Sequence, residues 1–293
     1  MRAERLFGKP IISLESDPSL DGNINGPSLI KTPVWLNGPL GKYYLYFAHH
    51  AGKFIRLAYS DALSGPWKIY VPGTLRLEQA IHLEQNPGHI ASPDVHIDDE
   101  NKRIIMYYHG LTKNSGWSQD TYAAISNNGI DFTPTGSLLG GFYWRVFKWG
   151  RYFYSIEMSG RVRRSINGLD NFEEGPVLHR DWDTRHMALK VSGSTLYVFF
   201  SIRGGCPESI VVSEIDLSKD WFEWKETPYK VLLEPETDYE GRNLPLEPSM
   251  GGIAKIPVRQ LRDPAIYEED GTTYLLYATA GENGIAIAKI YFD

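Results

Sequence analysis

The 293-residue sequence contains little of several features, and each scarcity excludes a class of protein. Its single cysteine, Cys206, rules out an internal disulfide framework. No apolar run is long enough to span a membrane, and residues 1–5 lack the apolar core of a signal peptide, so we expect a cytoplasmic protein without a membrane partner; a signal peptide already removed stays open. Basic residues (30) are fewer than acidic ones (36), which disfavours nucleic acid as a partner.

What the sequence does contain is a unit of about 45 to 75 residues that recurs five times with the same internal order. Each unit opens with a short apolar strand that starts at a polar residue: 31–35, 93–97, 142–146, 185–189 and 262–266. An aromatic-rich second strand follows: 43–48, 103–109, 152–157, 195–201 and 273–279. A third strand with a Ser/Asn/Gly turn and a short fourth strand complete the pattern.

Units of this length with four strands predict a five-bladed β-propeller, an all-β fold that occupies residues 1–293 as a single domain. Fourth strands are expected at 71–75, 136–139, 175–178 and 229–233. The fifth unit lacks one, and the N-terminal segment 8–12 is expected to close the last blade.

The inner positions of the repeat carry different chemistry in each unit, as expected for one site on a repeating scaffold. The starts of the first strands hold Thr32, Asp94, Tyr143, His186 and Asp263, and the ends of the second strands hold His49, His109, Glu157 and Arg203. Equivalent positions of all blades converge on one end of a propeller channel, so we expect these side chains to meet there.

Three of these residues are carboxylates, and glycosidic bond cleavage needs one protonated and one ionised carboxyl group. Glu157 lies in an apolar strand where burial would raise its pKa, which suits a general acid. Asp263, beside Arg262, suits a general base, and Asp94 is a second candidate for that role. Alternatively, Glu157 pairs with a neighbouring arginine, and Asp263-Pro264 only starts a strand.

Other residues are expected to bind the substrate. His109 and His186 can donate or accept hydrogen bonds, and either can serve as the general acid. The remaining expected contacts are His49, Asn25, Tyr143, Trp144, Trp117, Arg185, Arg203 and Arg262, with the loop 234–252 as a rim or lid. No HxH or HExxH spacing indicates a catalytic metal, so no cofactor is expected except a structural calcium ion in the channel, which stays open.

On residues 92–95, residues 262–266 and the Ser-x-x-x-x-Gly-Pro-Trp turn at 60–67, the chain resembles the five-bladed propeller glycoside hydrolases of families 43, 62, 32, 68, 117 and 130. The resemblance implies a base Asp in blade one, an Asp that tunes pKa in blade two and an acid Glu in blade three. Asp94 and Glu157 match the last two positions. Blade one offers Thr32 instead, so Asp263 or Asp21 would have to supply the base.

These residues predict an exo-acting, inverting glycoside hydrolase that cleaves at the end of a plant or algal oligosaccharide, in carbohydrate metabolism or polysaccharide degradation. Two alternatives remain open. One is a glycoside phosphorylase, with Arg185, His186 and Arg203 around the phosphate. The other is a sugar-binding propeller without turnover. The sequence fixes neither the sugar nor the oligomeric state.

Overall fold

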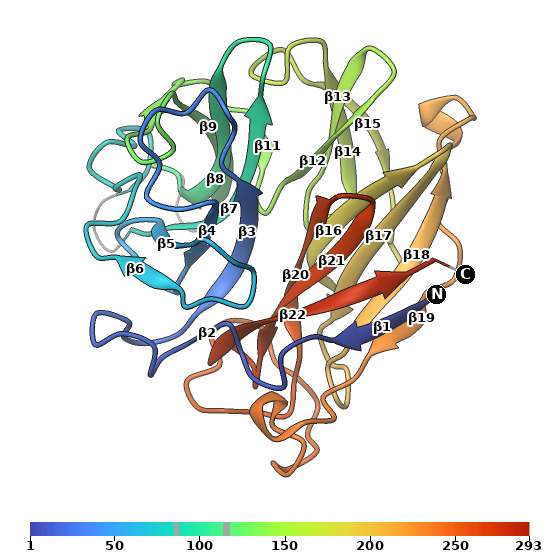
Figure 1. Cartoon of the computed structure of the whole chain (residues 1–293). Coiled ribbons are helices and arrows are strands. Elements are labelled where there is room, and N and C mark those ends of the chain that lie inside the picture. The colour runs from blue at the N-terminus through green and yellow to red at the C-terminus, as the bar shows by residue number, and fades with distance from the viewer. Residues whose placement is uncertain (85–87, 114–117, 293) are drawn as a thin grey trace.

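The computed structural model describes residues 1–84, 88–113 and 118–292, and their strands form five sheets arranged as the blades of a propeller (Figure 1). Blade one contains β3 (Asn25–Lys31), β4 (Tyr43–Ala48), β5 (Arg56–Ser60) and β6 (Lys68–Tyr70). Blade two contains β7 (Ile90–Asp98), β8 (Arg103–Leu111), β9 (Gln119–Ser126), β10 (Thr133–Pro134) and β11 (Gly140–Gly141). Blade three contains β12 (Arg145–Trp149), β13 (Tyr152–Ile156), β14 (Arg161–Ser165) and β15 (Glu173–Val177).

Blade four contains β16 (Thr184–Ser192), β17 (Thr195–Ile202), β18 (Ile210–Asp216) and β19 (Lys230–Leu233). Blade five contains β20 (Arg262–Glu269), β21 (Thr272–Thr279) and β22 (Gly284–Tyr291), with β1 (Arg2–Arg5) and β2 (Ile12–Ser13). Two short 3-10 turns, Trp221–Glu223 and Asp238–Glu240, complete the described elements. The predicted all-β five-bladed propeller is therefore confirmed.

The N-terminal segment closes blade five, as the sequence predicts, but through residues 2–5 and 12–13 instead of a strand at 8–12. Strand β1 runs antiparallel to β22, with Arg2 opposite Tyr291, and β2 pairs with the other end of the same strand. Figure 1 shows the blue β1 beside the red β22. Arg5 also donates from Nε to Oε1 of the fully buried Glu240 at 2.8 Å, which ties the closing strand to the loop after blade four.

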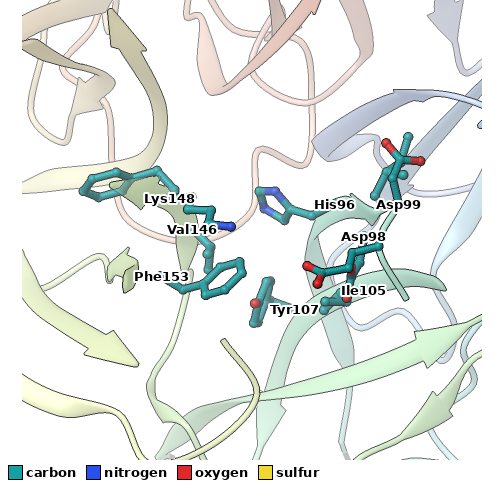
Figure 2. Close-up of a pocket in the computed structure, with 11 residues that line it drawn as sticks. His96, Asp98, Asp99, Ile105, Tyr107, Val146, Lys148 and Phe153 are labelled. Atoms are coloured by element: carbon teal, nitrogen blue, oxygen red, sulfur yellow. The ribbon is translucent and has the colours of Figure 1, made fainter. Parts of the chain in front are cut away.

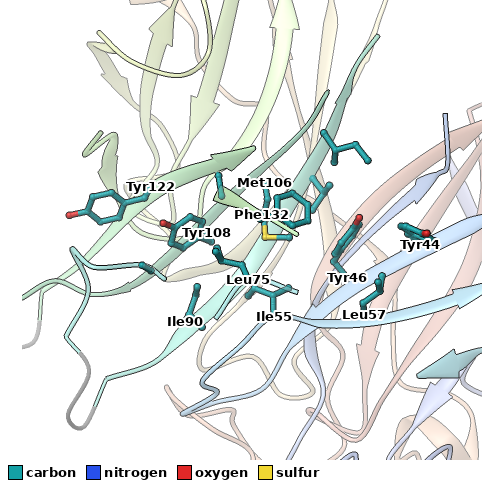
Figure 3. Close-up of a cluster of buried hydrophobic side chains, with 14 of the residues drawn as sticks. Tyr44, Tyr46, Ile55, Leu57, Leu75, Ile90, Met106, Tyr108, Tyr122 and Phe132 are labelled. Atoms are coloured by element: carbon teal, nitrogen blue, oxygen red, sulfur yellow. The ribbon is translucent and has the colours of Figure 1, made fainter. Parts of the chain in front are cut away.

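The cores lie between blades. The largest buried cluster joins aromatic and aliphatic side chains of blades one and two, and Figure 3 shows Tyr46, Leu57, Met106 and Tyr108 within it. Each such side chain contributes about 1.5–3 kcal/mol on burial. The hydroxyl of Tyr46 donates to the carbonyl of Gly129 at 2.7 Å, so its polar end is satisfied inside the core. This packing makes the blades a rigid frame for the channel.

The first strands predicted for blades one and three are misplaced. In blade one the inner strand covers 25–31, not 31–35, and its Gly26-Pro27 step stands at the register slip where blades two and five have Ser92-Pro93 and Asp263-Pro264. In blade three the inner strand covers 145–149, not 142–146. The fourth strands predicted at 71–75 and 136–139 are also misplaced, since β6 ends at Tyr70 and β10 and β11 flank the second segment.

Candidate active site

A cavity of about 330 Å³ opens at the end of the channel where the inner strands begin, and we call it the mouth cavity. Residues from all five blades or their connections line it: His50, His89, Gln119, Phe142, Tyr143, Met158, Arg185, His186, Arg203, Gly252, Asp263 and Glu282. Five residues predicted from sequence, Tyr143, Arg185, His186, Arg203 and Asp263, are therefore brought together.

A backbone irregularity that recurs in several blades positions some of these side chains in the cavity wall. The pairing of the inner strand slips by one residue at the same place in blades one, two, four and five. At this place Gly26, Ser92 and Asp263 have positive φ angles of 54°, 49° and 49°, and Tyr143 before β12 has 59°. Left-handed backbone at residues other than glycine is strained and concentrates at functional sites. Of these residues, Tyr143 and Asp263 line the mouth cavity, as do Arg185 and His186 at the slip in blade four.

A residue with a side chain at this position of blade one would be crowded by blade two. A Cβ on Gly26 would lie 3.1 Å from the Cα of Ser92. Instead, the backbone N–H of Gly26 donates to Oδ2 of Asp263 at 3.3 Å. The blade-five carboxylate thus reaches across to blade one, where the resemblance places the base.

Asp263 also forms a close pair with His186, since Nδ1 of His186 lies 2.5 Å from Oδ1 of Asp263. Burial alone would raise the pKa of Asp263, but the charges of His186, Arg185 and Arg262 outweigh it and hold this pKa well below its usual range. Burial, together with Arg145 and Arg185, lowers the pKa of His186. At neutral pH the pair is therefore an aspartate and a neutral imidazole, which can accept a proton.

A second histidine–carboxylate pair lines the same cavity. Nδ1 of His50 lies 2.8 Å from Oε2 of Glu282, whose Oε1 accepts from Nη1 of Arg262 at 2.9 Å. Glu282 is only 2% exposed. Asn25 lies beneath the pair, with Nδ2 3.5 Å from the carboxylate and 3.1 Å from the imidazole, and does not line the cavity. Asn25 and Arg262, both predicted to bind substrate, instead support this pair.

The cavity arginines are already neutralised. Arg185 donates from Nε and Nη2 to the fully buried Glu208 at 2.7 and 3.3 Å. Arg203 donates from Nε to Asp183 at 2.9 Å. With Asp263 and Glu282 on the walls as well, the described residues leave no uncompensated positive charge for an anionic ligand.

Aromatic rings form one wall. The ring centroid of Tyr143 lies 3.8 Å from that of His186 and 4.1 Å from that of His109. His109 is buried behind Tyr143, and neither of its ring nitrogens has a hydrogen-bond partner among the described residues. Burial lowers the pKa of His109 well below its usual value, so it is a neutral packing group here and not a cavity-lining one.

Glu157 does not line the mouth cavity. Its Oε1 accepts from Ser159 at 2.8 Å, and its Oε2 lies 3.7 Å from Nε of Arg163 and against Gly141. The neighbouring Met158 faces the cavity instead, as expected where adjacent residues of an extended chain point in opposite directions. This placement favours the alternative interpretation, an internal ion pair with an arginine.

Asp94 lies deeper in the channel, where it lines a separate space of about 120 Å³. Its Oδ2 accepts from the N–H of Val146 at 2.8 Å and lies 2.9 Å from Nε2 of His96. Burial opposes ionisation, but the charges of His96 and Arg145 prevail and lower the pKa of Asp94. The three predicted catalytic carboxylates therefore do not share one cavity.

A further cavity of about 310 Å³, the second cavity, lies between blades two and three at the opposite end of β7. Figure 2 shows His96, Tyr107 and Phe153 around it, together with Asp98 and Lys148. Asp98 holds Arg103 at 2.7 Å, so this acidic group is already paired. We assign no chemistry to this cavity.

Three other predicted contacts lie elsewhere. Trp144 is 2% exposed and packs against Phe172 in the core between blades, which corrects its predicted place against the substrate. His49 lies outside the mouth cavity with its ring edge toward Phe54, and burial, aided by Arg56, lowers its pKa to about 4. Trp117 lies outside the described residues.

Six lining residues were not among the predicted site residues: His50, His89, Gln119, Phe142, Met158 and Glu282. A signal was available for His50 and Glu282, because each follows the end of a second strand, β4 or β21, as Arg203 follows β17. His50 is adjacent to the predicted His49. The loop 234–252, predicted as a rim or lid, reaches the cavity only in part: Gly252 lines the cavity, whereas Glu240 is buried against Arg5 and Tyr277.

Within residues 1–84, 88–113 and 118–292, no three His, Cys, Asp or Glu side chains are arranged to hold a metal ion. The calcium ion left open by the sequence stays a prediction. The same described part of the chain contains no helix long and apolar enough to cross a membrane.

Comparison with known proteins identifies one relative at the sequence level. The uncharacterized protein R118 of Acanthamoeba polyphaga mimivirus is 38% identical over 299 residues, covering 92% of this chain and 84% of the relative. This chain belongs to the R118 family. No family model matches the sequence.

Solved structures share the fold of this R118 family member at low identity. A family-43 β-xylosidase/α-arabinofuranosidase from a compost metagenome superposes with a TM-score of 0.65 at 12% identity, covering 99% of this chain and 96% of that one. An exo-1,5-α-L-arabinanase from a bovine ruminal metagenome gives 0.59 at 12%, covering 92% and 94%. An N-acetylgalactosamine deacetylase from F. plautii gives 0.61 at 13%, covering 99% and 96%. The fold is thus common to enzymes of differing chemistry.

Proposed function

We propose that this R118 family member is a glycoside hydrolase that releases a neutral sugar from the end of an oligosaccharide with inversion at the anomeric carbon. The observation that carries the proposal is the His186–Asp263 pair in the wall of a cavity of about 330 Å³. A neutral imidazole held by an aspartate is suited to take a proton from an attacking water. The fold shared with family-43 hydrolases supports the same chemistry by analogy.

The size and walls of the mouth cavity support exo action. Its volume lies near the lower end of the range of about 300–1,000 Å³ for small-molecule sites, which suits the end of a chain better than its middle. The rings of Phe142 and Tyr143 offer faces for the C–H groups of a sugar, and Gln119 and the imidazoles offer partners for hydroxyls.

The neutralised arginines support a hydrolase over a phosphorylase. A phosphorylase would have to hold inorganic phosphate, which binds where cations are uncommitted. Arg185 and Arg203 are committed to Glu208 and Asp183. The same pairing favours a neutral sugar over a carboxylated or sulfated one.

The experiment is product release from a panel of plant and algal oligosaccharides, read by chromatography, with the anomer of the product followed by NMR. Wild type should release a monosaccharide of inverted configuration. The variant D263N should lose about 10²–10⁴-fold in kcat/KM, because an amide that donates toward Nδ1 disfavours the tautomer that accepts a proton at Nε2. E157Q, tested alongside, should keep most of the activity if Glu157 is the internal ion-pair partner.

Other outcomes would contradict the proposal. A sugar phosphate formed only when inorganic phosphate is present would identify a phosphorylase. Saturable binding of a sugar without turnover of any panel member would identify a binding propeller. If E157Q lost its activity while D263N stayed fully active, Glu157 of blade three would be the general acid and the His186–Asp263 pair would have no part in the reaction.

A further inference from the structure

The mouth cavity contains two imidazoles that are each held by a carboxylate through Nδ1. Asp263 holds His186 at 2.5 Å, and Glu282 holds His50 at 2.8 Å. A carboxylate can only accept, so Nδ1 carries the hydrogen in both rings when they are neutral. Nε2 is then left for a ligand, because both rings contact their carboxylates through Nδ1.

The two pairs stand on either side of blade five. Both carboxylates belong to that blade, Asp263 in β20 and Glu282 between β21 and β22. The inner strand β20 packs between β16 of blade four, which carries His186, and β3 of blade one, whose hairpin partner β4 precedes His50. A sugar in the cavity would therefore meet one imidazole from each flanking blade.

The His50–Glu282 pair is built into the protein interior. Arg262, 3% exposed, donates to Oε1 of Glu282, and the backbone N–H of His50 donates to Oδ1 of the buried Asn23 at 2.9 Å. These contacts fix both the carboxylate and the backbone that carries the imidazole. A surface histidine with an incidental carboxylate neighbour would not have such support.

We propose that His50, held by Glu282, is the general acid of this site and His186, held by Asp263, is its base. This assignment rests on the function proposed above. Exposure decides which imidazole takes which role: the side chain of His50 is 33% exposed, and that of His186 is 8% exposed. When the terminal sugar is enclosed, the rest of the oligosaccharide extends toward solvent, so the leaving oxygen lies on the His50 side.

The bond changes balance without a further reactant. Water attacks the anomeric carbon as its proton passes to Nε2 of His186, and the bond from that carbon to the glycosidic oxygen breaks. The leaving oxygen takes the proton from Nε2 of the His50 imidazolium, whose charge Glu282 stabilises. Proton exchange with solvent then restores both imidazoles. The aromatic and arginine residues of the cavity bind and orient the sugar.

The experiment compares two leaving groups on one sugar: the panel oligosaccharide that releases sugar, and the 2,4-dinitrophenyl glycoside of that sugar, whose phenolate departs without protonation. H50Q should lose about 100-fold or more in kcat/KM on the oligosaccharide and less than about 5-fold on the aryl glycoside. H186Q should lose on both substrates, and sodium azide should restore turnover with the aryl glycoside by forming a glycosyl azide. H82Q, a histidine outside the cavity that stacks on Tyr122, is the matched control.

Glu282 should act as a positioning residue, and the leaving group separates this role from a structural one. In E282Q the imidazole of His50 loses the carboxylate that orients it, so kcat/KM should fall on the oligosaccharide but stay near that of wild type on the aryl glycoside, and the melting temperature is checked separately. Equal losses of H50Q on both substrates, or no loss on either, would overturn the assignment of His50. Absence of release by wild type from either substrate would instead overturn the hydrolase proposal itself.

Discussion

Replacing Glu208 with glutamine should destabilise the whole chain, because this carboxylate neutralises a buried guanidinium beside the mouth cavity. Glu208 is fully buried and accepts from Arg185 at 2.7 and 3.3 Å and from Ser201 at 2.6 Å, with Nε of Arg262 at 3.5 Å. Breaking a buried ion pair from one side costs about 3–5 kcal/mol, since the other charge is left uncompensated.

Glutamine keeps the volume and some of the hydrogen bonds of Glu208, so the expected loss in the free energy of unfolding is about 3 kcal/mol. At about 2–3 °C per kcal/mol for a chain of this size, the melting temperature should fall by about 6–9 °C. Urea denaturation followed by circular dichroism measures the first quantity and a thermal melt the second. The matched control is E214Q, an exposed glutamate on β18, which should stay within about 0.5 kcal/mol of wild type.

A loss below about 1 kcal/mol in E208Q would refute the reasoning. It would mean that Arg185 does not depend on Glu208 for its counter-charge. The cavity could then offer a free cation to phosphate or to an anionic sugar, and the preference for a neutral substrate would lose its basis.

Two further predictions concern stability. Gly26→Ala should lower the free energy of unfolding by about 2–3 kcal/mol in urea denaturation, because φ is 54° and the new Cβ would press on Ser92. The control Gly22→Ala, at φ 73° with no atom within 4 Å, should lower it by about 1 kcal/mol or less, and equal losses would refute the crowding. Hydrogen bonds from Arg5 and from backbone N–H groups overcome the burial of Glu240 and lower its pKa. The stabilisation that ionised Glu240 contributes is therefore complete above about pH 5 and is lost as the pH falls through the pKa of this group in the folded protein. The difference in unfolding free energy between wild type and E240Q should narrow in acid, and a difference independent of pH would refute this reasoning.

The sequence was sufficient for the architecture because the repeat imposes it. Aromatic-rich strands such as 43–48 and 273–279 match β4 and β21, and turn residues separate them. The first strand of blade one was expected at 31–35 because Thr32-Pro33 imitates a strand start. The strand in fact starts at Asn25, and its Gly26-Pro27 step has no polar side chain where blades two and five have Ser92 and Asp263.

The sequence placed the candidate site at the correct end of the channel, but several predicted residues are adjacent in sequence to the ones that line the cavity. His49 and Glu157 were expected in the cavity, and their neighbours His50 and Met158 line it instead. Near the end of a strand the alternation of side chains breaks down, and the sequence does not say at which residue. Glu282 was missed because its role comes from contacts with His50 and Arg262, which lie 232 and 20 positions away in the chain, and no local pattern encodes such contacts.

Because β1 and β2 close blade five, this blade can separate from the rest of the protein before the chain as a whole unfolds. This blade supplies both Asp263 and Glu282, and its sheet holds together only while the two distant parts of the chain stay paired. None of the eight tryptophans lies in β20–β22 or in the two closing strands. If blade five separates first under mild denaturant, both imidazoles lose their carboxylates while most of the indole emission stays native, because Trp67 alone among the described tryptophans packs against the core that blade five shares with blade one. Fluorescence would then describe a nearly intact protein that had already lost both histidine–carboxylate pairs.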